Sequence, residues 1–234
     1  MSWESKTDYC GLAVAGKLIC KSSTENRSGQ YLERTGQHGA ICATKAYGTA
    51  NASPSNEYAV AADVSFAAGA VTLGAVKEID GKKYMLQSVS VKTSSAGEPT
   101  VSATAVQVED GAATGNCFKV PAFELSADDV AQALLGAFTL GGEKCELTEC
   151  GAEISCTVGL HTVNGDPVAS DPHTAHVQVS VTVLQAGAAE PTLTPAAGWD
   201  VSSPLTCSDP DSDLPTWTAT LSKPLEKTRV SSGS

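Results

Sequence analysis

Regular alternation of apolar and polar residues along most of the chain predicts β-strands. It is clearest over 174–184, where polar residues separate four valines: Val177, Val179, Val181 and Val183. Successive side chains of a strand point to opposite faces, so residues two apart share a face. We therefore expect a buried valine stripe here and a polar opposite face. Similar alternation over 58–66, 99–109 and 215–221 predicts further strands.

Two dipeptides predict tight turns between strands. Asp80-Gly81 separates the apolar stretches 71–79 and 82–92, and Asn164-Gly165 follows the predicted strand 153–163. Asp-Gly and Asn-Gly accept the positive φ angles of two-residue hairpin turns. A hairpin at Asp80-Gly81 places Glu78 opposite Lys83, a weakly favourable pair across the strands.

One segment has the pattern of a helix. Ser126 and Asp129 form a capping arrangement, and Gly141-Gly142 supplies a stop. Apolar residues recur between them at helical spacing: Val130, Ala131, Leu134, Leu135 and Phe138. The pattern predicts a short amphipathic α-helix at about 126–138 that packs on a sheet.

These patterns give a fold class and a domain organisation. We expect a mainly β protein, an antiparallel β-sandwich or barrel with one short flanking α-helix. Residues 1–57 form an irregular N-terminal arm with one strand around 40–47, residues 58–225 form the β-sandwich domain, and residues 226–234 form a flexible tail. Segments 88–102 and 180–194 share seven of fifteen residues, which indicates either a duplicated strand–loop–strand unit or two similar hairpins.

Charge is distributed unevenly along the chain. The formal net charge is −11, and residues 101–234 contain seventeen acidic and five basic residues. Such a field repels nucleic-acid phosphates and anionic membranes, which argues against tight binding to either. The same repulsion suits a protein that lines a path through which DNA slides.

Nothing in the sequence predicts export or membrane insertion. The N-terminal residues lack the basic start and the continuous apolar core of a signal peptide, and no apolar run is long enough to span a bilayer. We therefore expect synthesis in a host cytoplasm, with the eight cysteines reduced and structural. No C-x-x-C motif is present.

Candidate chemical motifs are each incomplete. Gly11–Leu18 approaches a P-loop, but Leu18 stands where Ser or Thr would hold magnesium. Asp209, Asp211 and Asp213 imitate the start of a calcium loop, yet Leu214 and Thr220 replace the required Gly and Glu. Strand parity argues against a zinc site, because it puts two of the four candidate ligands on each face: Cys145, Cys150, Cys156 and His161. His173 and His176 have no HExxH partner. We predict no enzyme, and no catalytic, cofactor-binding or metal-binding residues.

The layout of these elements resembles the major tail-tube proteins of tailed bacteriophages and related contractile injection systems. The resemblance covers roughly residues 40–225 and depends on the Asp80-Gly81 hairpin, the long strands at 84–92 and 174–184, and the lone helix. It implies a virion protein whose subunits self-associate into stacked rings, contact other particle proteins, and enclose an acidic channel for DNA passage.

Two alternatives remain open at this stage. One is another virion component, such as a capsid decoration protein or a tail terminator, which would form closed trimers or single rings. The other is a monomeric ligand-binding or surface-binding β-sandwich. That module would display an exposed aromatic platform, for which Trp199 and Trp217 are the candidates.

Overall fold

The computed structural model describes residues 6–36, 38–108, 116–127, 134–163, 166–208, 210 and 212–229. Within these residues the chain is mainly β and the strand pairs are antiparallel, as the alternation predicts. The elements in chain order are β1 Leu18–Thr35, β2 Ile41–Val60, β3 Val64–Phe66, β4 Thr72–Leu73, β5 Val76–Ile79, β6 Lys82–Ser94, β7 Gly97–Val108, β8 Asn116–Lys119, β9 Phe123–Leu125, the 3-10 turn η1 Leu134–Gly136, β10 Phe138–Gly141, β11 Cys145–Val163, β12 Asp166–Gln185, β13 Thr192–Pro195, β14 Asp200–Cys207, β15 Thr216–Pro224 and β16 Lys227–Arg229.

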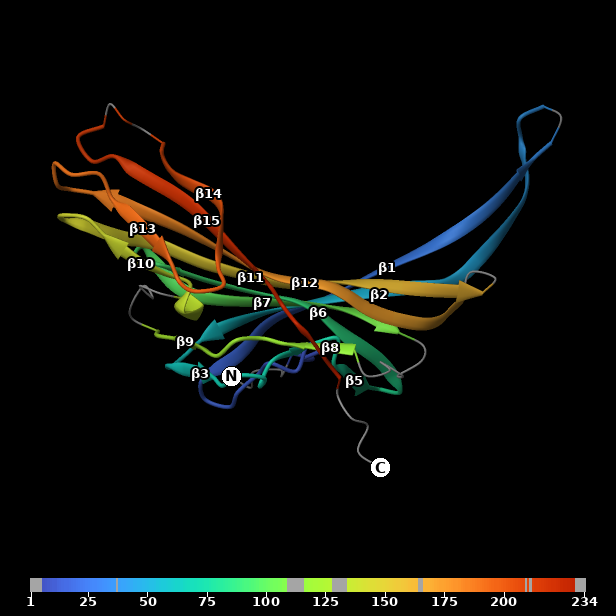
Figure 1. Ribbon diagram of the computed structural model, residues 1–234. Coiled ribbons are helices and arrows are strands. Elements are labelled where there is room, and N and C mark those ends of the chain that lie inside the picture. The colour runs from blue at the N-terminus through green and yellow to red at the C-terminus, as the bar shows by residue number, and fades with distance from the viewer. Residues whose placement is uncertain are drawn as a thin grey trace, which may run out of the picture.

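One large sheet organises the molecule. Its strands follow the order β1-β2-β7-β6-β11-β12-β15-β14, and β5 pairs with β6 beside this path. Figure 1 shows the sheet curving upward at both sides, with β1 and β2 rising at one side and β14 and β15 at the other. The three small sheets, β3–β9, β4–β8–β16 and β10–β13, complete the fold.

The hydrophobic core lies on one face of the large sheet. Val177 and Val179 of β12 are fully buried there, in one cluster with Leu73 of β4, Phe118 of β8 and Phe123 of β9. The small sheets thus cover this face as the second layer of a sandwich. In Figure 1 β3, β8 and β9 lie below the large sheet, on its convex side. The concave face is opposite the core.

Several expectations from the sequence are confirmed. All four valines of the β12 stripe are at most 2% exposed, whereas Gln178 and Ser180 are exposed. Asp80 and Gly81 have φ angles of 51° and 73°, and the β5–β6 hairpin that they join places Glu78 opposite Lys83. The predicted turn at Asn164-Gly165 lies outside the described residues.

The expected irregular N-terminal arm is wrong. β1 has 18 residues, β2 has 20, and the two pair along almost their full length. β2 runs through position 57, so the domain boundary expected there falls inside a strand. Alternation fails to reveal these strands because polar side chains occupy both faces where the ribbon leaves the core. Glu25 to Arg27 and Glu33 to Thr35, for example, include no buried side chain.

The expected α-helix at 126–138 is not seen in the described part of this segment. Residues 128–133 lie outside the description, Leu134–Gly136 form a 3-10 turn, and Phe138 begins β10. Leu135 and Gly136 have φ angles of 61° and 62°, which no α-helix contains. Leu134 and Leu135 lie in the turn and Phe138 lies in the strand, and all three contact the core. In the described residues no helix has the length and apolar character to cross a bilayer.

Two smaller expectations also change. The expected flexible tail begins with β16, which pairs with β8, and residues 230–234 are outside the described part. The two similar segments differ in strand pairing. Segment 88–102 forms the β6–β7 hairpin, but in segment 180–194 β12 belongs to the large sheet and β13 pairs with β10. The two segments are therefore similar in sequence but differ in how their strands pair.

Candidate assembly surface

The near-P-loop is part of a turn that leads into an edge strand. Gly11 and Gly16 have φ angles of 74°, and Val14 bridges to Leu18 at the start of β1. A P-loop connects a buried strand to a helix whose N-terminus faces the phosphates. A strand follows this turn instead of a helix, so the segment does not provide a phosphate site.

Four described cysteines, Cys10, Cys117, Cys150 and Cys156, are buried, and Cys20, Cys145 and Cys207 are partly exposed. Cys150 and Cys156 both face the core, as the strand parity predicts, whereas Cys145 is partly exposed and His161 is exposed. Burial raises the pKa of Cys10 to about 12 and those of Cys150 and Cys156 to about 11. Protonated, buried thiols are poor nucleophiles and poor metal ligands. The described residues contain no group of three or more side chains suited to hold a metal ion.

The concave face of the large sheet, here called the open face, has a polar row that runs from edge to edge, and Met85, Val106 and Val108 form a separate buried apolar cluster on the same face of β6 and β7. Paired positions can be followed across all eight strands of the path, and every member of this row carries a polar side chain: Ser22, Glu57, Ser102, Ser90, Glu153, Gln178, Ser222 and Asp200. A neighbouring row contains Thr100, Lys92, Ser180 and Thr220. An antiparallel sheet with one solvated face has this composition.

Hydroxyl groups on the open face pair with one another. Ser88 and Thr104 are 2.6 Å apart between their side-chain oxygens, and Thr24 and Ser55 are 2.7 Å apart. Such cross-strand pairs satisfy hydroxyls within the sheet. Around these pairs the open face is therefore hydrophilic and made of short side chains that have partners within the sheet.

Carboxylates outnumber ammonium groups on the open face. Glu57, Glu149, Glu153 and Asp200 lie at its paired positions. Lys92 lies 3.4 Å from Glu149 and Lys21 lies 3.7 Å from Glu57, both as exposed ion pairs of little energetic weight. Gly151 lacks a side chain between β6 and β12, which leaves an open hollow lined also by Lys92, Glu149 and Ser180.

β1 forms one end of the path and β14 the other, and no described strand pairs with the outer edge of either. β2 pairs with β7 only over Ser55–Ala59, so residues 25–35 of β1 and 41–54 of β2 project as a two-stranded ribbon, here called the arm. Figure 1 shows the arm extending well beyond the body. A free edge has unpaired backbone donors and acceptors and pairs readily with another chain.

Exposed large apolar residues gather at these edges. Among the described residues they are Val14, Ile19, Ile41, Val201 and Leu214, each at least 39% exposed. The first three lie before β1, in β1 and in β2, and the last two lie in β14 and in the loop that follows it. Where exposure is described, the six strands β5, β6, β7, β11, β12 and β15 have none. In the described residues, large exposed apolar side chains thus lie at or next to the ends of the path and not on its central strands.

Residues 7–12, here called the strap, hold the base of the arm on the core side. The buried side-chain oxygen of Asn56 accepts hydrogen bonds from the amides of Tyr9, at 3.0 Å, and Cys10, at 3.3 Å. The Asn56 amide group donates to the Thr7 carbonyl at 2.8 Å. Tyr9 also packs edge-on against Tyr84 of β6, with ring centroids 5.0 Å apart. The strap therefore connects β2 with the centre of the large sheet.

The two tryptophans do not form an exposed platform. Trp199 is 7% exposed, and the Lys223 ammonium lies 5.9 Å from its ring centroid. Trp217 is partly buried, and its indole N–H donates to the side-chain oxygen of Gln185 at 2.8 Å. The aromatic surface expected for a monomeric binding module is therefore not found at these positions.

Sequence reasoning missed both the arm and the strap, since residues 1–57 seemed irregular. Asn56 and Tyr58 could have indicated the strap, because their polar groups lie on the core face of β2 and require partners from another segment.

A scan of the chain against models of protein families gave no match, and a search of curated proteins found no similar sequence.

Proposed function

We propose that this protein is a structural subunit of a phage-like particle, a tail-tube protein that forms stacked rings around an acidic channel for DNA passage. The observation that carries the proposal is the open face: an uncovered, carboxylate-bearing surface that crosses all eight strands of the path. Its concave shape and short polar side chains suit the lining of a channel.

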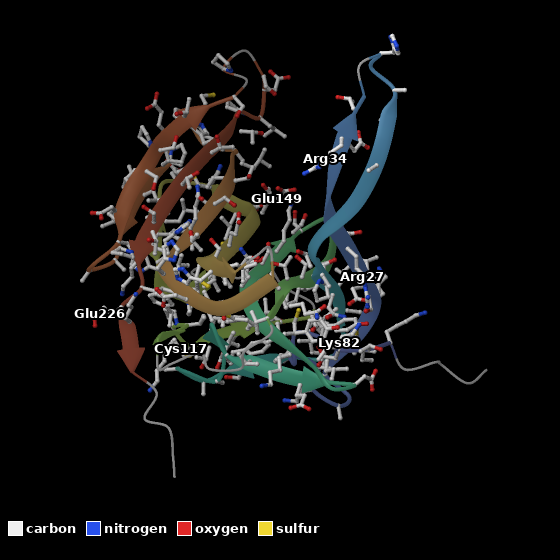
Figure 2. The ribbon with its side chains drawn as sticks, turned by 90° about the vertical axis from the view of Figure 1, so that its right-hand side faces the viewer. Arg27, Arg34, Lys82, Cys117, Glu149 and Glu226 are labelled. Atoms are coloured by element: carbon white, nitrogen blue, oxygen red, sulfur yellow. The ribbon has the colours of Figure 1, made fainter. Side chains whose placement is uncertain are left out.

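Electrostatics supports this role for the open face. A lining with more carboxylates than ammonium groups repels the phosphates of duplex DNA, so DNA slides without being held. Figure 2 labels Glu149 on the side of the sheet toward which the arm and the C-terminal strands rise. The strong negative charge of residues 101–234 adds to the same field.

The free edges support self-association. A two-stranded ribbon alone in water is marginally stable, and in the described residues no third strand pairs with the arm, residues 25–35 of β1 and 41–54 of β2. Neighbouring subunits would supply that third strand. Assembly would also bury the apolar residues that the edges expose. The proposal locates the protein in the virion, after synthesis in the host cytoplasm.

Assembly of the purified full-length chain tests the proposal. Light scattering and negative-stain electron microscopy over a range of concentrations should show rings that stack into open tubes. Closed trimers or single rings that never stack would favour a decoration protein or a tail terminator instead. A chain that stays monomeric at high concentration contradicts the tube and favours the monomeric binding module.

The channel can be tested separately from assembly. The double variant Glu149→Lys, Glu153→Lys changes the charge of the open face, and Glu124→Lys, Glu190→Lys makes the same change at exposed positions outside the large sheet. The first variant should still assemble but should retain duplex DNA in a salt-dependent manner, since added lysines attract phosphates. Equal DNA retention by both variants would contradict a channel at the open face.

A further inference from the structure

The two edges of the large sheet run in opposite directions. The path contains eight strands, and each neighbouring pair on it is antiparallel. With an even number of strands, β1 and β14 must point oppositely. When two copies stand side by side in the same orientation, β14 of one copy therefore meets β1 of the next as an antiparallel neighbour. The alternation of strand direction then continues across the boundary between copies.

The two edges also differ in charge. Residues 17–35, which include β1, contain four basic and two acidic residues, and the exposed Lys21, Arg27 and Arg34 are among the basic ones. Residues 199–215, which include β14, contain four aspartates and no basic residue, and Asp200 and Asp213 are exposed. Figure 2 shows Arg34 on the projecting part of the arm. Opposite charges favour contact between unlike edges, and like charges disfavour contact between identical ones.

Apolar residues add contact area at both edges. Ile19 of β1 is 51% exposed beside Val14, which is 39% exposed, and at the other edge Val201 and Leu214 are 44% and 50% exposed. Burial of such residues against a partner gives a contact energy that salt does not screen. Both edges thus expose apolar residues, and in addition the β1 edge is basic and the β14 edge is acidic.

β14 is shaped to limit which strands it accepts. Its register against β15 shifts on both sides of Ser203, and Pro204 lies in the second irregular stretch. Bulges and proline are the features by which edge strands avoid pairing with copies of themselves. The outer edge of β1 contains no proline over its 18 residues. Contact between two β14 edges is accordingly the least favourable combination.

From strand direction, charge and apolar exposure together, we infer that subunits join head to tail, with β14 of one copy against β1 of the next. The inference rests on the proposed ring-forming function and names the two surfaces that make the ring. Such a contact uses a different patch on each partner, so it propagates around a ring and does not stop at a dimer. It also continues the open face from one subunit to the next.

Charge reversal at each edge tests the inference. The β1 variant is Lys21→Glu, Arg34→Glu, and the β14 variant is Asp200→Lys, Asp213→Lys; all four positions are exposed, so folding should be retained. Each variant alone should raise the concentration needed for assembly by at least about tenfold, because like charges meet in the β1 variant and the attraction between the edges is lost in the β14 variant. The fourfold variant should assemble at a lower concentration than either double variant, as should an equimolar mixture of the two double variants.

The outcomes separate this inference from the proposed function. Glu98→Lys, Glu124→Lys serves as the control away from both edges and should assemble as the wild type does. If the wild type assembles but the β14 variant is unaffected, or if the fourfold variant is not rescued, the pairing of β14 with β1 is wrong while the ring proposal stands. If the wild type never assembles, both fall. Circular dichroism of each variant verifies that folding is intact.

Discussion

The Tyr58 hydroxyl donates a hydrogen bond of 2.5 Å to the carboxylate of Asp8, which lies fifty positions earlier in the chain. Tyr58 is fully buried on β2, and Asp8 also accepts hydrogen bonds from the amides of Gly11 and Ala13. The Lys77 ammonium lies 3.7 Å from the same carboxylate. One ionised side chain therefore connects the strap with β2 and β5.

Stability should depend on the ionisation of Asp8. Burial alone would raise its pKa, but the hydrogen bonds from Tyr58, Ala13 and Gly11 and the charge of Lys77 outweigh burial, so the pKa lies below the usual 3.8. A folded pKa below the unfolded one gives stability that is complete above the unfolded pKa and is lost as pH falls through the folded pKa. The contribution should thus disappear in the acid range below about pH 4.

Asp8→Asn tests this dependence. At pH 7 the variant should lose about 1.5–3 kcal/mol, the range for hydrogen bonds to a charged group. Its urea midpoint should then change less than that of the wild type as pH is lowered from 5 toward 2. Glu124→Gln, at an exposed position, is the control. Parallel pH curves for wild type and Asp8→Asn would show that the carboxylate is not the responsible group.

Asn56→Ala should weaken the strap. The change removes the acceptor for the Tyr9 and Cys10 amides and the donor to the Thr7 carbonyl, and each buried group left without a partner costs about 1–3 kcal/mol. Asn26→Ala, at an exposed position of β1, should change stability by less than about 0.5 kcal/mol. Denaturant titration measures both, and limited proteolysis should cut Asn56→Ala first near residues 6–12. Equal effects of the two changes would contradict the assigned role of Asn56.

The sequence predicted best those strands that have one face in the core. At β12 the valines at 177 to 183 alternate with polar residues because one face contacts the second layer and the other faces solvent. The Asp80-Gly81 turn was predictable because positive φ restricts residue choice locally. In both cases the physical cause acts within a few residues.

The features that sequence reasoning missed depend on distant partners. At Glu25 to Arg27 and Glu33 to Thr35 of the arm no side chain is buried, so these stretches show no apolar period and are defined by backbone pairing between β1 and β2. Leu134, Leu135 and Phe138 have helical spacing, yet the pairing of Phe138 with Pro195 in β13 draws it into a strand. No motif marked the open face either, since its polar row becomes continuous only when eight separate strands are aligned.

The register of β12 can be tested with one pair of substitutions. Val179 is 0% exposed and Ser180 is exposed, although they are adjacent. Val179→Asp should prevent folding, because an unpaired charge in the core costs several kcal/mol, whereas Ser180→Asp should be tolerated. Soluble yield and circular dichroism distinguish the two. Similar behaviour of both variants would mean that the strand does not have this orientation.

Two glycines provide a matched test of the β5–β6 turn. Neither Gly81 nor Gly97 has a neighbour within 4 Å of an added Cβ, but only Gly81 has a positive φ, of 73°. Gly81→Ala should therefore destabilise the protein by about 1–2 kcal/mol through backbone strain alone. Gly97→Ala should be neutral or stabilising by up to about 1 kcal/mol, since it restricts the unfolded chain. The difference between the thermal midpoints of the two variants measures the cost of placing a Cβ in the left-handed conformation. Equal midpoints would show that Gly81 does not adopt this conformation.

Hydrogen exchange of the arm connects the fold to the proposed assembly. In an isolated subunit the outer edge of β1 lacks a strand partner, so backbone amides there should exchange quickly, while those of the central strand β11, which pairs on both sides, should exchange slowly. If a neighbouring strand covers β1 in a ring, its outward-facing amides should become protected on assembly and β11 should change little. Mass spectrometry of dilute subunits and of assembled particles would measure this. Protection that increases uniformly, or that leaves β1 unchanged, would mean that the rings form through another surface, because only an edge contact supplies acceptors to those amides.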